Sequence, residues 1–293
     1  MDIFTYLEQH PALFLTYAGI LGLLVGSFLN VVILRLPVML ERQWQRDCKT
    51  LLGEEVVDES SPPFNLIHPR SHCPKCKHQI TAWENIPVFS YLFLRGRCSS
   101  CGTRIPSRYP LTEILTACLT LIVAWQFGPG WQALAAMVLT WAFIALSVID
   151  IDHQILPDSI TLPILWLGLF LSLFGIFTDS NSAIVGGLIG YLSLWSIFHL
   201  FRLLTGKEGM GYGDFKLLAL IGAWLGWQHL LTVILLSSLV GAIIGIAMIL
   251  LRGHDRSIPI PFGPYLAIAG WITLITRDEL VEFYRYWLGL PQG

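Results

Sequence analysis

Long apolar runs are the feature that most restricts how this chain can fold. Residues 11–34 form 24 consecutive positions without a charged side chain, and residues 217–251 form 35 more in which His229 is the single ionisable group. The hydrocarbon core of a bilayer needs roughly 20 apolar residues per helix. Only 13% of the residues are charged, whereas about 25% is usual in soluble domains. The sequence therefore predicts an all-α polytopic membrane protein.

We expect about eight membrane-spanning helices. The run 217–251 is too long for one span, and it divides most naturally into two helices at residues 226–229. The other predicted spans are 12–34, 111–127, 131–149, 160–177, 183–203 and 262–276. No basic residue precedes the first apolar run, so we interpret that run as a permanent span and not as a cleaved signal peptide.

The positions of lysine and arginine predict the orientation of these spans. The segment 35–108 holds 11 of the 18 basic residues, 202–216 adds three, and 252–256 adds two. With eight spans, all of these fall on one side of the membrane, and only Arg277 and Arg285 fall on the other. Short loops rich in lysine and arginine stay in the cytoplasm. The large loop is therefore predicted to be cytoplasmic and both termini to be external.

This pattern divides the chain into three predicted parts. Residues 1–35 form a first transmembrane helix, 36–109 a cytoplasmic loop domain, and 110–293 a transmembrane core. The net charge of −2 gives no reason to expect nucleic acid as a partner, whereas membrane lipid is an obligatory one. Gly22 and Gly26 have the spacing of close helix packing, for which we expect a contact within the chain.

Two CxxC pairs lie in the predicted loop, Cys73 with Cys76 and Cys98 with Cys101, and 21 residues separate them. Two such pairs commonly supply four thiolates to a tetrahedral zinc ion, although the usual spacer is slightly shorter. A metal would supply folding energy to a loop too small to build its own core. The alternatives are two disulfides or a redox pair, although a cytoplasmic loop disfavours stable disulfides.

Other cysteines and histidines near the loop are less informative. His72 and His78 flank the first pair, and either can substitute as a metal ligand, but surface histidines are the simpler interpretation. Cys48 and Cys118 have no partner in the pattern, and Cys118 is most simply a small buried apolar residue within a span.

Two aspartates stand where predicted spans meet the cytoplasmic side. Asp150 ends the third span, and Asp214 begins the sixth after the glycine-rich segment 209–213, so both fall at the same membrane depth. A carboxylate at the edge of a bilayer is costly and is usually functional. Two carboxyl groups brought together can hydrolyse a peptide, because one takes a proton from water while the other, protonated, polarises the scissile carbonyl. The glycines suit unusual backbone conformations and the close approach of a substrate.

Other interpretations of these aspartates stay open from position alone. Either can be a helix cap, because the helix dipole stabilises an aspartate at an N-terminus, and Asp158 after Pro157 is itself expected to be an N-cap. A proton-coupled transporter or an assembly scaffold would also explain them, although the other spans carry few ionisable groups. Asp152 competes with Asp150, since residues two apart on a helix point about 200° apart.

Taken together, the motifs resemble those of the type IV prepilin leader peptidases, which are membrane aspartyl peptidases of the GxGD type. The resemblance covers essentially the whole chain. The matching segments are Gly-Tyr-Gly-Asp at 211–214, Asp-x-Asp-x-x-x-Leu-Pro-Asp at 150–158, the double CxxC, and the segments 26–32, 83–87, 108–110 and 261–265.

The resemblance implies an enzyme of the bacterial inner membrane. It would cut the leader from type IV prepilins and type II secretion pseudopilins after a glycine at the cytoplasmic face, with Asp150 and Asp214 as the catalytic residues. Members with the four-cysteine loop also methylate the new N-terminal amine with S-adenosylmethionine. This second activity rests on resemblance alone, because no Rossmann-like motif indicates a donor site, and a peptidase without methyltransferase activity is the alternative.

Overall fold

The structure is a computed structural model, and in the part of the chain that it describes all regular elements are helices. No β-strand occurs in those residues. The described residues are 3–54, 64–207, 209–252 and 261–277, with only the backbone given for 248–252. Arg256 and Arg285, which entered the prediction of orientation, lie outside them. The chain forms two compact units, Met1–Pro129 and Gly130–Gly293.

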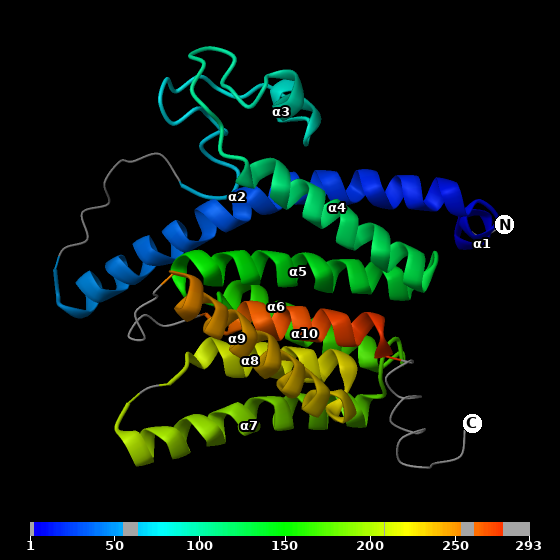
Figure 1. Ribbon diagram of the computed structural model, residues 1–293, viewed down its shortest axis with the longest axis vertical. Coiled ribbons are helices and arrows are strands. Elements are labelled where there is room, and N and C mark those ends of the chain that lie inside the picture. The colour runs from blue at the N-terminus through cyan, green and yellow to red at the C-terminus, as the bar shows by residue number, and fades with distance from the viewer. Residues whose placement is uncertain (1–2, 55–63, 208, 253–260, 278–293) are drawn as a thin grey trace. The chain divides into compact units, whose positions relative to one another are not determined.

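The first unit is built on a helix of 41 residues, α2 (Pro11–Leu51), which follows the short helix α1 (Ile3–Gln9) (Figure 1). It contains the predicted span 12–34 and continues through Pro37 into a charged and exposed segment. At 1.5 Å per residue its length is about 60 Å, twice the hydrocarbon core of a bilayer. The predicted loop domain, 36–109, therefore begins inside a helix.

Helix α4 (Arg108–Phe127) packs along α2 within the first unit. A Cβ atom on Gly22 would lie 2.7 Å from the Cα atom of Ala117, and one on Gly26 would lie 2.7 Å from the Cα atom of Glu113. Only glycine lets the two backbones approach this closely. The predicted contact within the chain at these two glycines is confirmed.

Residues 64–107, which precede α4, are irregular apart from a 3-10 turn, η1 (Trp83–Asn85), and a short helix, α3 (Phe89–Phe93). Arg35 anchors the beginning of this segment to α2. The guanidinium donates hydrogen bonds to the carbonyl oxygens of Asn65 at 2.9 Å and Pro69 at 2.7 Å. One basic side chain therefore satisfies several carbonyl groups that have no partner in regular structure.

The second unit surrounds one buried helix, α8. Eleven of its 14 residues are buried, and it contacts α6, α7, α9 and α10 (Figure 1). The helices of this unit are α5 (Trp131–His153), α6 (Asp158–Ser172), α7 (Ser180–Thr205), α8 (Tyr212–Leu225), α9 (Leu230–Arg252) and α10 (Gly263–Ile275), with a 3-10 turn, η2 (Trp227–His229), before α9.

Small residues and one indole group hold α8 against its neighbours. Gly186 of α7 and Gly222 of α8 face each other backbone to backbone, with no room for a side chain on either. On another side, Nε1 of Trp224 donates a hydrogen bond of 2.8 Å to the carbonyl oxygen of Ile164 in α6. Close packing at small residues is the usual way in which membrane helices associate.

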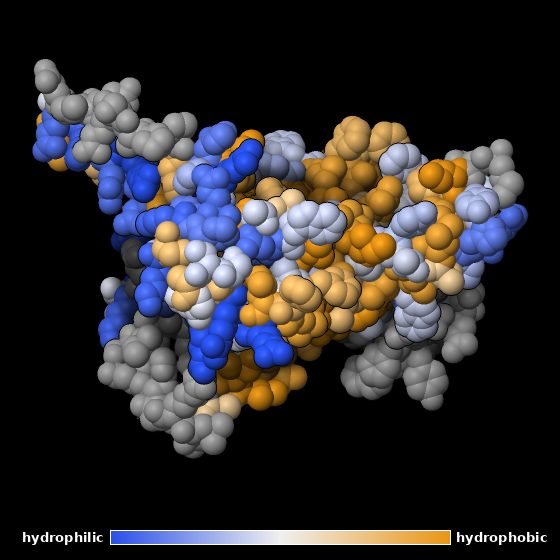
Figure 2. Space-filling model, turned by 90° about the horizontal axis from the view of Figure 1, so that it is seen from above, coloured by the Kyte–Doolittle hydropathy of each residue, from blue (hydrophilic) through white to orange (hydrophobic). Residues whose placement is uncertain are grey.

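Each of the eight predicted spans corresponds to a helix, namely α2 or one of α4 to α10. Five of the described helices are long and apolar enough to cross a bilayer, whereas α6 and α10 are shorter apolar helices. Large apolar side chains such as Leu24, Trp166 and Leu188 are exposed on these helices, and apolar side chains cover the middle of the face in Figure 2. The predicted multi-pass, all-α membrane fold is confirmed.

Candidate functional site

Helix α5 carries Asp150 in its last turn. The helix ends at His153, where Gln154 adopts a left-handed conformation with φ of 54° and its N–H bonds to the carbonyl oxygen of Asp150 at 2.9 Å. This C-terminal turn redirects the chain toward α6. The side chain of Asp150 is 5% exposed, whereas Asp152 is exposed to solvent. Spacing in the sequence did not choose between these two aspartates, whereas in the structure only Asp150 is buried.

Asp214 occupies the first turn of α8, immediately after the glycine-rich segment. It is 6% exposed, and its Oδ2 lies beside Gly211, the N-cap residue, where an added Cβ atom would be 3.8 Å away. It also lies close enough to Asp150 for the two charges to interact. The Asp214 carboxyl group thus lies in the first turn of α8 and near a second buried carboxyl group, that of Asp150.

A third helix end completes this site. The backbone N–H of Gly263, at the start of α10, donates a hydrogen bond of 3.0 Å to Oδ2 of Asp150. The motif at 261–265 was noted in the sequence without a role, and this contact supplies one. The end of α5 and the starts of α8 and α10 therefore converge around the two aspartates.

Leu156 packs between the starts of α8 and α10. A Cβ atom on Gly213 would lie 2.8 Å from Cβ of Leu156, and one on Gly263 would lie 3.1 Å from Cδ2 of the same side chain. Gly211 has φ of −83° and Gly213 lies within α8, so unusual backbone conformation does not explain these two glycines. Gly213 instead allows the close approach of Leu156, a contact within the chain, and the approach of a substrate to these glycines stays a prediction.

The expectation that Asp158 is an N-cap is wrong. Pro157 occupies the cap position without a side-chain hydrogen bond, and Asp158 is the first residue of α6. Both carboxylate oxygens of Asp158 lie 2.7 Å from Nζ of Lys216 in α8. The pair joins α6 and α8 beside the aspartates, and because it is largely exposed it stabilises the fold by about 1 kcal/mol or less.

The four cysteines of the double CxxC lie together in the first unit. Their Sγ atoms are all within 4.8 Å of one another. The Sγ atoms of Cys73 and Cys101 are 3.8 Å apart, and those of Cys76 and Cys98 are 3.9 Å apart. Tetrahedral zinc with bonds of about 2.3 Å places its sulfur ligands about 3.8 Å apart. The four thiols therefore have the spacing of a metal site, and they can hold one metal ion.

Each CxxC forms the same tight turn. The N–H of Lys77 bonds to the carbonyl oxygen of Cys73 at 2.9 Å, and the N–H of Gly102 bonds to that of Cys98 at 3.0 Å. Both closing residues are left-handed, with φ of 60° at Lys77 and 68° at Gly102. The second turn uses glycine, for which this conformation is easy, and the first uses lysine, for which it is strained.

Hydrogen bonds favour the thiolate form of two of these cysteines. The side chain and backbone of Thr103 lower the pKa of Cys101 to about 6. The backbone N–H groups of Cys76 and Lys75 lower the pKa of the Cys73 thiol below its usual value. Because the thiolate is the metal ligand, these hydrogen bonds favour cation binding at Cys73 and Cys101. Burial and the neighbouring thiols raise the pKa of Cys76 to about 11, so in the metal-free loop this thiol stays protonated.

The two flanking histidines have other partners. Nε2 of His78 lies 3.3 Å from the Glu84 carboxylate, and Nδ1 of His72 bonds to a backbone carbonyl at 3.0 Å. Hydrogen bonds from the Ser99 hydroxyl and from Thr81 lower the pKa of Glu84 to about 2, so this carboxylate is ionised at neutral pH. Neither histidine belongs to the cysteine cluster, and substitution of either as a ligand is not observed.

Comparison with known proteins decides the family. Residues 137–246 match the model of the type IV leader peptidase family, and residues 20–127 match that of the bacterial peptidase A24 N-terminal domain. A protein of Pseudomonas aeruginosa named prepilin leader peptidase/N-methyltransferase is 55% identical over 289 residues, 99% of each chain. This chain belongs to the type IV leader peptidase family.

Other relatives carry the same name. The Aeromonas hydrophila protein is 57% identical over 276 residues, and the Neisseria gonorrhoeae protein is 49% identical over 274 residues, each alignment covering 94% of both chains. No solved structure matches the chain significantly. In this family member the paired aspartates fall within the leader-peptidase match and the cysteine cluster within the N-terminal match. The resemblance inferred from the motifs is confirmed.

Proposed function

We propose that this chain cleaves the leader peptide of type IV prepilins and of type II secretion pseudopilins after a glycine, with Asp150 and Asp214 as the catalytic pair. The observation that carries the proposal is the meeting of two buried carboxyl groups at the end of α5 and the start of α8. Membership of the leader peptidase family and the names of the relatives support the substrate class.

In the proposed reaction, one carboxylate accepts a proton from water while the water oxygen attacks the scissile carbonyl carbon. The other carboxyl group is protonated and donates a hydrogen bond to the carbonyl oxygen. The C–N bond then breaks, and a proton returns to the leaving amine. Two adjacent carboxyl groups favour a state in which they share one proton. The N–H of Gly263 bonds to Oδ2 of Asp150. In this proposal Oδ1 of Asp150 is the oxygen that accepts the proton from water.

The proposed setting is the bacterial inner membrane, with the large loop in the cytoplasm and both termini outside. The bias of basic residues toward one side supports this orientation. Cleavage would then occur at the cytoplasmic face, where a leader that remains outside the hydrocarbon core can reach the aspartates. Accessibility labelling of cysteines introduced at positions 45 and 129 in intact cells tests the orientation, because the proposal places only position 129 outside.

We also propose that Cys73, Cys76, Cys98 and Cys101 bind one structural zinc ion. The sulfur spacings and the thiolate-favouring hydrogen bonds support this assignment. Bound zinc would join the two turns of the loop and supply folding energy. Metal analysis is expected to find about one zinc per chain. A chain without metal, in which all four thiols are freely alkylated, would reject the site.

The second proposed activity is methylation of the new N-terminal residue with S-adenosylmethionine. Cleavage releases the amine that would accept the methyl group, and the bound donor supplies an electrophilic methyl. The N-methyltransferase part of the relatives' name supports this proposal. Incubation of the enzyme with prepilin and methyl-labelled donor tests it, since label must appear in the mature pilin. Normal cleavage without label would leave a peptidase alone.

The decisive experiment for the peptidase is conversion of purified prepilin to a shorter product in detergent. Asp150→Asn and Asp214→Asn are each expected to reduce the rate about a thousandfold or more, as loss of an acid–base residue does. Asp152→Asn is the matched control, because it changes an exposed aspartate on the same helix. Wild-type cleavage by either of the first two variants would contradict the pair. Proton-coupled flux without any product would instead favour a transporter.

A further inference from the structure

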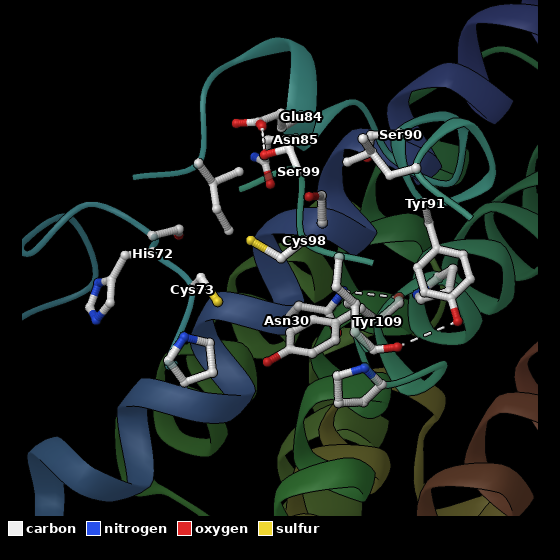
Figure 3. Close-up of a pocket in the computed structure, with 18 of the residues that line it drawn as sticks. Asn30, His72, Cys73, Glu84, Asn85, Ser90, Tyr91, Cys98, Ser99 and Tyr109 are labelled. Atoms are coloured by element: carbon white, nitrogen blue, oxygen red, sulfur yellow. Dashed lines mark hydrogen bonds between the residues drawn. The ribbon is translucent and has the colours of Figure 1, made fainter. Parts of the chain in front are cut away.

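The first unit contains a cavity of about 370 Å³ between the cysteine loop and the helices α2 and α4 (Figure 3). Cavities of about 300–1,000 Å³ commonly hold small organic ligands. A metal ion needs far less space than this. Cys73 and Cys98 form part of the cavity wall, so the proposed zinc site borders the cavity without filling it.

The cavity has a loop side and a helix side. Figure 3 shows Glu84, Asn85 and Ser99 on the loop side, with Asn30 of α2 and Tyr109 of α4 on the opposite side. The side-chain amide of Asn30 donates a hydrogen bond of 3.1 Å to the backbone carbonyl of Tyr109, which ties the two helices together beneath the cavity. The loop therefore closes a space whose floor belongs to the helix pair.

The lining combines a negative charge with aromatic rings. Glu84 is ionised, and the rings of Tyr91 and Tyr109 border the same space. Among the basic residues of the lining, Arg35 is committed to loop carbonyl groups, whereas Arg104 is exposed at the edge. Aromatic faces bind cations and stack on planar bases. This combination suits an organic cation that carries a planar ring system.

Several lining groups are held in place before any ligand binds. Glu113 is 8% exposed and its carboxylate accepts a hydrogen bond of 2.7 Å from the N–H of Val88. Val88 has φ of 62°, a rare conformation for a β-branched residue that persists only where its surroundings impose it. The hydroxyl of Tyr91 donates to the carbonyl oxygen of Ile105 at 3.5 Å. A rigid lining reduces the entropy lost on binding.

We propose that this cavity binds the methyl donor S-adenosylmethionine, with Glu84 as the counter-charge to its sulfonium and ammonium groups and a tyrosine ring against its adenine. The inference rests on the N-methyltransferase half of the proposed function, and it adds where the donor binds. Arg104 at the edge suits the carboxylate of the donor.

The transfer itself balances without another reactant. The lone pair of the neutral N-terminal amine forms the new N–C bond as the C–S bond breaks, and the electrons of that bond remain on sulfur, which becomes a neutral thioether. The proton lost from nitrogen passes to water. An ionised carboxylate near the sulfonium favours binding of the donor over binding of the product, because the sulfur carries a positive charge only before the transfer.

Donor binding, measured by equilibrium dialysis of the full-length protein in detergent with labelled S-adenosylmethionine, tests the site. Glu84→Gln and Tyr109→Ala are each expected to raise the Kd about tenfold, the usual effect of losing a charge-assisted or aromatic contact. Glu41→Gln, an exposed position on α2, is the matched control. S-adenosylhomocysteine should compete for the site, and ATP should not. Ultraviolet cross-linking of the donor should label peptides from 80–113.

The outcomes of these experiments distinguish the proposed donor site from the methyltransferase activity on which it rests. Wild-type donor affinity in both variants, together with methyl transfer by the wild type, would reject the cavity as the donor site and leave the methyltransferase proposal intact. A wild-type protein that neither binds the donor nor labels pilin would overturn both. Thermal unfolding and zinc content verify that each variant is folded. Should Glu84→Gln fail this check, Tyr109→Ala and the cross-linked peptides decide the result.

Discussion

The backbone N–H of Gly263 donates a hydrogen bond of 3.0 Å to Oδ2 of Asp150, a residue 113 positions earlier in the sequence. The contact holds the start of α10 against the end of α5, and it orients a buried carboxylate without adding a charge. A Cβ atom at position 263 would lie 2.7 Å from the same oxygen. Glycine is therefore required for this approach.

Gly263→Ala is expected to lower the kcat of leader cleavage about ten- to a hundredfold, because displacing a reacting group by a fraction of an ångström is costly. KM should change much less, since the substitution acts on the orientation of Asp150. Steady-state kinetics with purified prepilin measure both constants. Gly130→Ala is the matched control, because a Cβ atom there meets nothing within 4 Å and its φ of 171° is extended. An unchanged kcat in the folded Gly263→Ala protein would deny Gly263 a positioning role.

The ion pair between Lys216 and Asp158 is expected to matter little. Its side chains are 31% and 53% exposed, so Lys216→Met should lower the free energy of unfolding by at most about 1 kcal/mol. Thermal unfolding in detergent, with Asp158→Asn and the double variant, measures the coupling between the two residues. Cleavage should persist in all three. A large loss of kcat in folded Lys216→Met would instead place this lysine in the reaction.

Removal of the metal should loosen the cysteine loop. Cys73→Ser is expected to abolish stoichiometric zinc binding and to speed cleavage by trypsin after Lys75 and Arg97, two exposed residues whose backbone the metal would hold in place. The folding energy of a small metal site comes largely from the metal. Cys48→Ser is the control, since Cys48 lies outside the cluster. Metal analysis and timed proteolysis provide the two readouts. A protease-resistant loop in metal-free Cys73→Ser would show that the loop folds without zinc.

The two CxxC turns should respond differently to substitution. Gly102→Ala places a Cβ atom at a left-handed position and is expected to cost about 1 kcal/mol, which appears as roughly fivefold faster loss of zinc to a chelator. Lys77→Gly removes the same strain from the first turn and should retain zinc at least as well as the wild type. Equal zinc loss from all three proteins would mean that backbone strain does not limit metal retention.

Much of the fold was predictable because hydropathy is a local property. Each predicted span is a helix, and the division of the run 217–251 at 226–229 coincides with η2. Helix ends were less predictable. α2 extends to Leu51, well beyond its apolar part, because charged residues also form helix where no turn signal stops them. Asp158 was misassigned because its partner, Lys216, belongs to another helix.

The parts of the site also differ in how far the local sequence predicts them. The cysteine cluster and the aspartates follow from local motifs, and the structure brings each set together. The roles of Gly263 and Leu156 depend on how α5, α8 and α10 pack, and no spacing in the sequence encodes that packing. The cavity is a still clearer case. Its residues Asn30, Glu84 and Tyr109 lie in the motifs at 26–32, 83–87 and 108–110, whose roles the sequence alone does not indicate, and only the packing of α2, α4 and the loop brings them around one space.

The burial of α8 has a consequence for how the protein is made. A 14-residue helix is about 21 Å long, too short to cross a bilayer alone, and its surroundings include α9 and α10, which are synthesised after it. The surroundings of Asp214 are therefore complete only after α10 has been made. A chain that stops before α10 would also lack Gly263, whose N–H bonds to Asp150, so a truncated product would hold only part of this site.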